Sequence, residues 1–167
     1  ASPGEDRQGG AGAAVRELIS LEAQGIIAAG LFDDDDPGRT AVKDARKYTN
    51  LNQKVNLLPA EFDPLKNPKG SGKIEIEDVV SLALIERFYG ANPNLQPEEK
   101  TTRGNLLRIV IAGPDKERAA AWICEHASFE DMAKIVYVLC MLRQSIGLPL
   151  PKACPSLPKW LRELSAS

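Results

Sequence analysis

The stretch SFEDMAKIVYVLCMLRQSI, residues 128–146, is apolar around much of the circumference that a helix would present. Ser128 and Asp131 resemble a capping box at its start, and Gly147 followed by Pro149 marks its end. A helix of this composition is typical of the centre of a helical bundle. The alternative is that part of one face is left open for a partner. The stretch therefore predicts a central helix in an α-helical fold.

Working outward from this helix, apolar residues at helical spacing predict further helices on both sides. Aspartates and prolines at segment starts, and glycines at segment ends, set their limits. The expected helices cover residues 13–31, 37–48, 78–88, 97–111, 114–126 and 158–164. Because no strands alternate with them, an α/β arrangement is disfavoured. The sequence thus predicts an all-α protein, a compact bundle of about six helices.

The domain organisation follows from the same pattern. Residues 1–12 contain four glycines and almost nothing apolar, which predicts a flexible tail. Residues 49–73 lack periodicity and predict a long irregular loop. We expect residues 13–167 to form a single helical domain with its densest core at 74–147.

Composition excludes several classes of protein. The chain has 167 residues, 43% hydrophobic and 26% charged, which is a normal globular composition. A net charge of −2 argues against a wholly basic nucleic-acid binder. No apolar run approaches the roughly 18 residues that a membrane helix needs. Three cysteines (Cys124, Cys140 and Cys154) cannot all pair, so we expect a reducing intracellular compartment, cytoplasm or nucleus.

No motif with specific chemistry is complete. The run Asp33–Asp36 before Pro37 predicts a helix start; as a calcium loop it has a proline where a ligand is needed. Gly70–Lys73 lacks the first glycine and the hydroxyl residue of a phosphate-binding loop. His126 and the cysteines lack zinc-site spacing. We therefore expect no metal, no cofactor and no enzymatic activity, with a helical enzyme that carries no recognisable motif as one alternative.

One predicted helix carries a basic face. Its cations fall at relative positions 0, 4, 7 and 8, which place them on one arc of the helix. Lys54 and the aromatic Tyr48 follow closely. The candidate nucleic-acid-binding residues are Arg39, Lys43, Arg46, Lys47, Tyr48 and Lys54. A soluble, solvated helix face is the other interpretation.

The C-terminal residues 148–167 suggest a docking arm. Prolines favour an extended path, and large apolar side chains suit a groove on another chain. The candidate partner-binding residues are Leu148, Leu150, Trp160 and Leu161. The leading hypothesis is a non-enzymatic binding or assembly module that associates with itself or with a protein partner, as part of a nucleoprotein or capsid-like complex. The first alternative is RNA or DNA binding by the basic helix 39–47.

Overall fold

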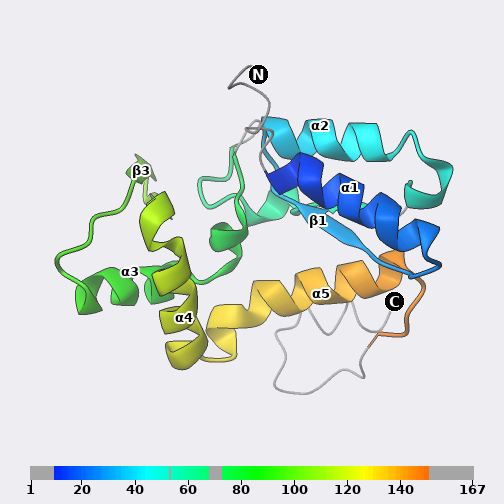
Figure 1. The fold of residues 1–167 in the computed structure, drawn as a ribbon. Coiled ribbons are helices and arrows are strands. Elements are labelled where there is room, and N and C mark those ends of the chain that lie inside the picture. The colour runs from blue at the N-terminus through cyan, green and yellow to red at the C-terminus, as the bar shows by residue number, and fades with distance from the viewer. Residues whose placement is uncertain (1–9, 53, 68–72, 151–167) are drawn as a thin grey trace, which may run out of the picture.

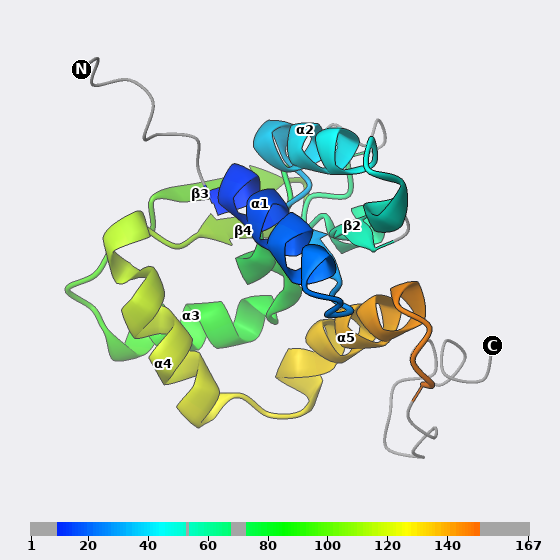
Figure 2. The ribbon, with the colours of Figure 1, turned by 45° about the vertical axis from the view of Figure 1, so that its right-hand side comes forward.

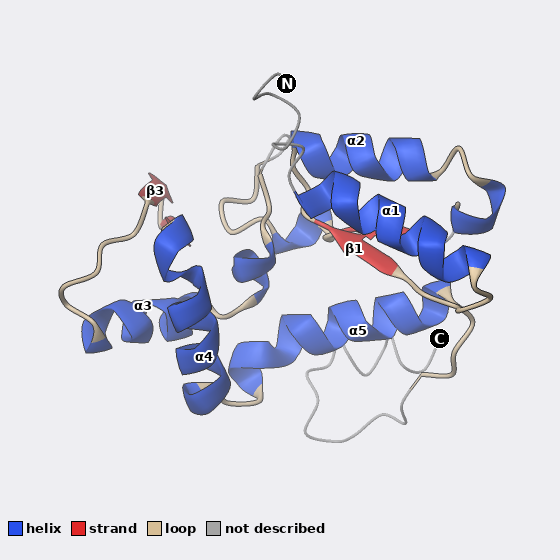
Figure 3. Ribbon diagram, viewed as in Figure 1, coloured by secondary structure: helices blue, strands red, loops and turns tan. Residues whose placement is uncertain are grey.

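A computed structural model describes residues 10–52, 54–67 and 73–150. In these residues it contains five α-helices and two small two-stranded sheets (Figures 1 and 3). The prediction of an all-α bundle of about six helices is therefore wrong, and the fold is mixed α and β. The elements are α1 (Gly10–Ala23), β1 (Gly30–Phe32), α2 (Asp36–Ala45), β2 (Val55–Leu57), α3 (Leu82–Ala91), β3 (Glu99–Arg103), β4 (Leu106–Val110), α4 (Lys116–His126) and α5 (Ala133–Ser145).

Residues 10–58 form what we call the N-terminal lobe. Strands β1 and β2 run parallel, with α2 in the connection between them and α1 packed beside α2. One face of this strand pair, with α1 and α2, encloses a buried cluster of Leu18, Phe32, Ala41, Val42, Ala45, Leu51 and Val55. Both strands have only three residues, which is too short for an alternating pattern to stand out in the sequence.

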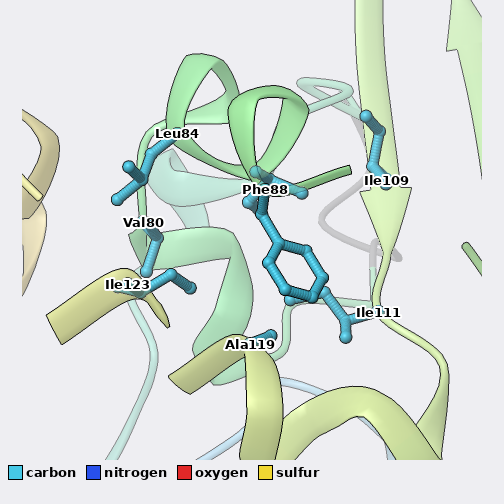
Figure 4. Close-up of a cluster of buried hydrophobic side chains, with 8 residues drawn as sticks. Val80, Leu84, Phe88, Ile109, Ile111, Ala119 and Ile123 are labelled. Atoms are coloured by element: carbon cyan, nitrogen blue, oxygen red, sulfur yellow. The ribbon is translucent and has the colours of Figure 1, made fainter. Parts of the chain in front are cut away.

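Residues 79–127 form the C-terminal lobe, built from α3, the antiparallel hairpin β3–β4 and α4. Figure 4 shows the side chains of its core gathered around Phe88, which is fully buried. The cluster consists of Val80, Leu84, Ile85, Phe88, Ile109, Ile111, Ala119 and Ile123. Trp122 packs edge-on against Phe88 with ring centroids 5.8 Å apart.

The hairpin replaces the helix that the sequence predicts at residues 97–111. A two-residue turn joins β3 to β4, and its first residue, Gly104, has a φ of +60°, which suits glycine. After the turn, Leu107, Ile109 and Ile111 face the core at every second position. Arg108 points to the other side. The period is therefore two, although the apolar residues also fit helical spacing.

The helix predicted from the opening stretch is present as α5, after a 3₁₀ turn at Glu130–Met132. It packs on the face of the strand pair opposite to α1 and α2, where Val138 is buried together with Leu58. This third cluster also contains Val79 and packs against Leu31, so α5 connects the two lobes. Leu139 nevertheless remains 54% exposed, so the helix is not buried all round.

The N-terminal elements also differ from the prediction. Helix α1 begins at Gly10, within the segment expected to be a tail, and ends at Ala23 rather than near residue 31. The region 49–73 contains strand β2 and 3₁₀ turns at Thr49–Leu51 and Ala60–Phe62. Within the described part of the chain, no helix has the length and apolar character needed to cross a membrane.

Candidate protein-binding surface

Helix α1 ends in a Schellman motif. The N–H of Gly25 donates to the carbonyl of Glu22 at 3.0 Å, and the N–H of Ile26 donates to that of Leu21 at 2.9 Å. Gly25 has a φ of +74°, which a side chain would strain. The motif turns the chain sharply and leaves Ile26 and Ile27 on the surface, 47% and 66% exposed.

Helix α5 ends in the same motif. The N–H of Gly147 donates to the carbonyl of Gln144 at 3.0 Å, and the N–H of Leu148 donates to that of Arg143 at 2.9 Å. Gly147 also has a φ of +74°. Leu148 is 46% exposed after this turn. The two helices therefore each present an aliphatic side chain immediately after a glycine stop.

These two turns lie at one end of the molecule. Figures 1 and 2 both place the turn after α1 close to the C-terminal end of α5. The Asn56 side chain of β2 donates to the Gly30 carbonyl at 3.4 Å and to the Ser145 hydroxyl at 3.3 Å, which ties the end of α5 to the strand pair. We call this surface, with Ile26, Ile27 and Leu148, the α1–α5 end.

A groove of about 440 Å³ adjoins the α1–α5 end. Its floor is apolar because Leu51 is almost fully buried there, while Tyr48 stands 53% exposed at its rim. Glu22 lines it as well and accepts two hydrogen bonds from Lys54, at 2.8 and 2.9 Å. The lining residues are Ile19, Glu22, Ala23, Tyr48, Asn50 and Leu51. An apolar floor with a polar rim suits a buried apolar side chain from another chain.

The chain leaves α5 along a fixed path. The Nε and Nη2 atoms of Arg143 both donate to the carbonyl oxygen of Pro149, at 2.9 and 2.7 Å. Leu148 and Leu150, two of the predicted partner-binding residues, thus lie at this end, exposed and half-buried respectively. Trp160 and Leu161 lie outside the described residues.

No protein family, curated protein or solved structure matches this chain. Its function must therefore be inferred from its own geometry.

The predicted basic face is largely neutralised. The Arg39 guanidinium contacts Asp34 at 2.7 Å and Asp36 at 3.3 Å. Lys47 pairs with Asp44 at 2.7 Å, in addition to the pair of Lys54 with Glu22. Three of the five cations therefore already have carboxylate partners on the same molecule.

The two remaining cations of the predicted basic face are Lys43 and Arg46, which together carry a charge of +2. Lys43 and Arg46 are exposed and make no ion pair within the residues that the structure describes. Tyr48, a candidate for stacking on bases, lines the groove beside α1. The residues that the structure describes therefore give no support for an RNA-binding or nucleoprotein role.

Two aspartates of the run Asp33–Asp36 accept hydrogen bonds from backbone N–H groups. Asp35 accepts the Gly38 N–H at 2.8 Å as the N-cap of α2, which confirms the predicted helix start. Asp33 accepts the Ile76 N–H at 2.9 Å. Burial raises the pKa of Asp33 above its usual range, although this hydrogen bond opposes the shift. Among the residues described, no three His, Cys, Asp or Glu side chains come together in a way that suits a metal ion.

The sequence analysis missed Ile26 and Ile27 as surface residues. Their spacing fits the apolar stripe of α1, and both fall within the helix predicted over residues 13–31, which in the structure ends at Ala23. The available signal was Gly25, because a glycine followed by an apolar residue is typical of a helix end.

Proposed function

We propose that this protein is an assembly module that binds a second copy of itself through the α1–α5 end. The observation that carries the proposal is the 66% exposure of Ile27 beside the half-exposed Ile26 and Leu148. Exposed apolar residues that occur singly are ordinary, whereas several at one end of a molecule, next to an apolar groove, favour a binding surface.

The helix-end motif offers a packing partner to Ile26 and Leu148 but not to Ile27. In a Schellman motif, the residue after the glycine usually packs against the last turn of its own helix. Ile26 and Leu148 each occupy that position, and each is about half exposed. Ile27 follows the motif and gains nothing from it, so its exposed surface costs free energy in water. Association would remove that surface from water.

A second copy is the simplest partner for such a surface. Two copies related by a two-fold axis would bring the same apolar patch together from both sides. The contact then needs complementarity only with itself. The few charged groups at the surface, such as the pair of Lys54 with Glu22, already satisfy each other and would lie at its edge.

The test is the solution mass of the full-length chain as a function of concentration, by sedimentation velocity. We expect a mass above 18.1 kDa that falls on dilution. Ile27→Asp should weaken self-association by about tenfold or more, because a carboxylate would then be desolvated at the contact.

The matched control is Phe129→Asp. Phe129 is 48% exposed but lies just before α5, at the opposite end of that helix. It should leave self-association unchanged, and circular dichroism should show both variants folded. A wild-type protein that stays monomeric at 100 µM (about the weakest association of interest), or equal loss in both variants, would overturn the proposal.

A further inference from the structure

We infer that the groove beside α1 holds the C-terminal segment 158–164 of the second copy, so that two chains exchange arms. This inference rests on the proposed function and names the segment that makes the contact. The groove, the exit of the chain from α5 and the sequence of the arm carry it together.

The arm starts at the correct end of the molecule. The Schellman turn at Gly147 and the two hydrogen bonds from Arg143 to Pro149 fix the direction in which the chain leaves α5. The described residues end at Leu150, and 17 residues follow. At about 3.3 Å per extended residue, the seven residues before Pro158 span at most about 25 Å.

The arm has the composition of a short amphipathic ligand. Its sequence from Pro158 reads PKWLREL, with Trp160, Leu161 and Leu164 at positions 0, 1 and 4. This spacing predicts one apolar face after a proline start. Tryptophan and leucine together supply a large apolar surface, and tryptophan is the residue most enriched among binding hot spots.

The groove provides what a tryptophan needs. The floor formed by Leu51 and Ile19 offers apolar contact, and Tyr48 offers an exposed ring for an edge-to-face pair. The indole N–H requires an acceptor when it is buried. Asn50 and Glu22 line the same groove and carry acceptor oxygens.

The layers of the fold favour exchange between copies over return to the same copy. The groove belongs to the side of the strand pair that α1 and α2 cover, whereas α5 packs on the opposite side through Leu31 and Leu58. An arm binding its own groove would have to bend around the strands within seven residues. The sequence of that stretch contains Pro151 and Pro155, and proline restricts the φ angles available for such a bend.

The experiment uses two full-length variants with different defects. Trp160→Ala removes the ligand and keeps the groove. Ala23→Arg fills the groove and keeps the arm, because Ala23 is an exposed lining residue at the end of α1, where arginine is a good helix former. Each variant alone should associate at least about 30-fold more weakly than the wild type.

Mixing the two variants gives the decisive measurement. The arm of the Ala23→Arg chain can enter the groove of the Trp160→Ala chain, so the mixture should regain association through one arm, measured by sedimentation velocity. Glu163→Gln on the arm's polar side is the control and should associate as the wild type does.

Three results separate this inference from the proposed function. If Ile27→Asp weakens association and Trp160→Ala does not, the α1–α5 end binds a second copy without the arm, and arm exchange is wrong. If the mixture stays as weak as each variant alone, arm exchange is also wrong. If the wild type is monomeric and its tryptophan emission, from Trp122 and Trp160 together, is blue-shifted relative to that of the Ala23→Arg chain, the arm binds its own groove, which overturns both.

Discussion

The two lobes handle their apolar residues in different ways. Between residues 10 and 58 of the N-terminal lobe, three large apolar side chains are exposed (Ile26, Ile27 and Tyr48), and a groove opens beside them. Between residues 79 and 127 of the C-terminal lobe, Leu82 is the only large apolar side chain that is exposed, and its exposed fraction is 37%. From this comparison we propose that the core of the C-terminal lobe contributes most to stability and that the exposed apolar residues of the N-terminal lobe belong to the proposed binding surface.

The core of the C-terminal lobe is packed by aromatic contacts within α3 and between α3 and α4. Phe88 is fully buried and meets Tyr89 at 5.1 Å and Trp122 at 5.8 Å between ring centroids. A buried ion pair lies on the other side of its hairpin, where Arg108 contacts Asp78 at 2.8 Å. In the N-terminal lobe, by contrast, the Tyr48 side chain is 53% exposed within the described residues.

The largest expected effect comes from removing a buried side chain from the core of the C-terminal lobe. Phe88→Ala should lower the free energy of unfolding by about 3–5 kcal/mol, because it removes a large buried side chain and leaves a cavity. Urea unfolding measures it, followed by Trp122 fluorescence in a Trp160→Phe background, where Trp122 is the remaining tryptophan.

Phe129→Ala is the matched control, since Phe129 is 48% exposed and should change the free energy of unfolding by less than about 0.5 kcal/mol. A loss of under about 1 kcal/mol for Phe88→Ala would contradict the assignment of this lobe as the stable part.

A smaller loss of stability is expected at a closely packed position of the N-terminal lobe. At Gly38, an added Cβ would lie 2.0 Å from the Asp33 carbonyl oxygen, so Gly38→Ala must shift the backbone at the start of α2. We expect a loss of about 2–3 kcal/mol in the free energy of unfolding, measured in urea.

The matched substitution in the C-terminal lobe is Gly90→Ala. Gly90 lies within α3, and an added Cβ there meets nothing within 4 Å. Alanine should stabilise this helix by about 0.5–1 kcal/mol. The same substitution would then have opposite signs in the two lobes, and equal signs would show that the backbone at Gly38 is not as closely packed as described.

The fold could be predicted from the sequence where helices carry strong boundary signals. Helix α2 starts at its aspartate cap, and α4 and α5 lie close to the predicted residues. The hairpin was missed because the apolar residues of β4 satisfy a helical period and a strand period equally. Its distinguishing signal, Gly104 next to Asn105 between β-branched residues, was local and easily outweighed.

The candidate site was predictable only in part. Leu148 and Leu150 were identified from the prolines around them. Ile26 and Ile27 were not, because their exposure depends on the chain turning at Gly25, and β1 then pairs with a strand 25 residues further along. The cations of residues 39–47 are predicted to share one face, but Asp34 and Glu22 come close to Arg39 and Lys54 only in the folded chain.

An effect about as small as that of Gly90→Ala concerns the contact between the start of α5 and the C-terminal lobe. Asp131, just before α5, accepts hydrogen bonds from the hydroxyl of Ser81 and from the backbone and hydroxyl of Ser128, and it pairs with Arg87. These contacts, that of Ser81 foremost, lower its pKa to about 2. Because the folded chain holds the charged form, this stabilisation is present above the unfolded pKa of about 4 and is lost as the pH falls towards 2.

Asp131→Asn should therefore cost about 1 kcal/mol at pH 7, a value reduced for solvent screening, and the difference from the wild type should shrink towards zero near pH 2. Urea unfolding at pH 7, 4 and 2.5 measures this difference, with Glu130→Gln as the control for loss of one charge next to it. A difference that stays constant with pH would mean that Asp131 acts through shape alone. The contacts that join α5 to the N-terminal lobe are the apolar cluster around Val138 and the hydrogen bond from Asn56 to Ser145. Neither titrates, so they should not change this difference with pH.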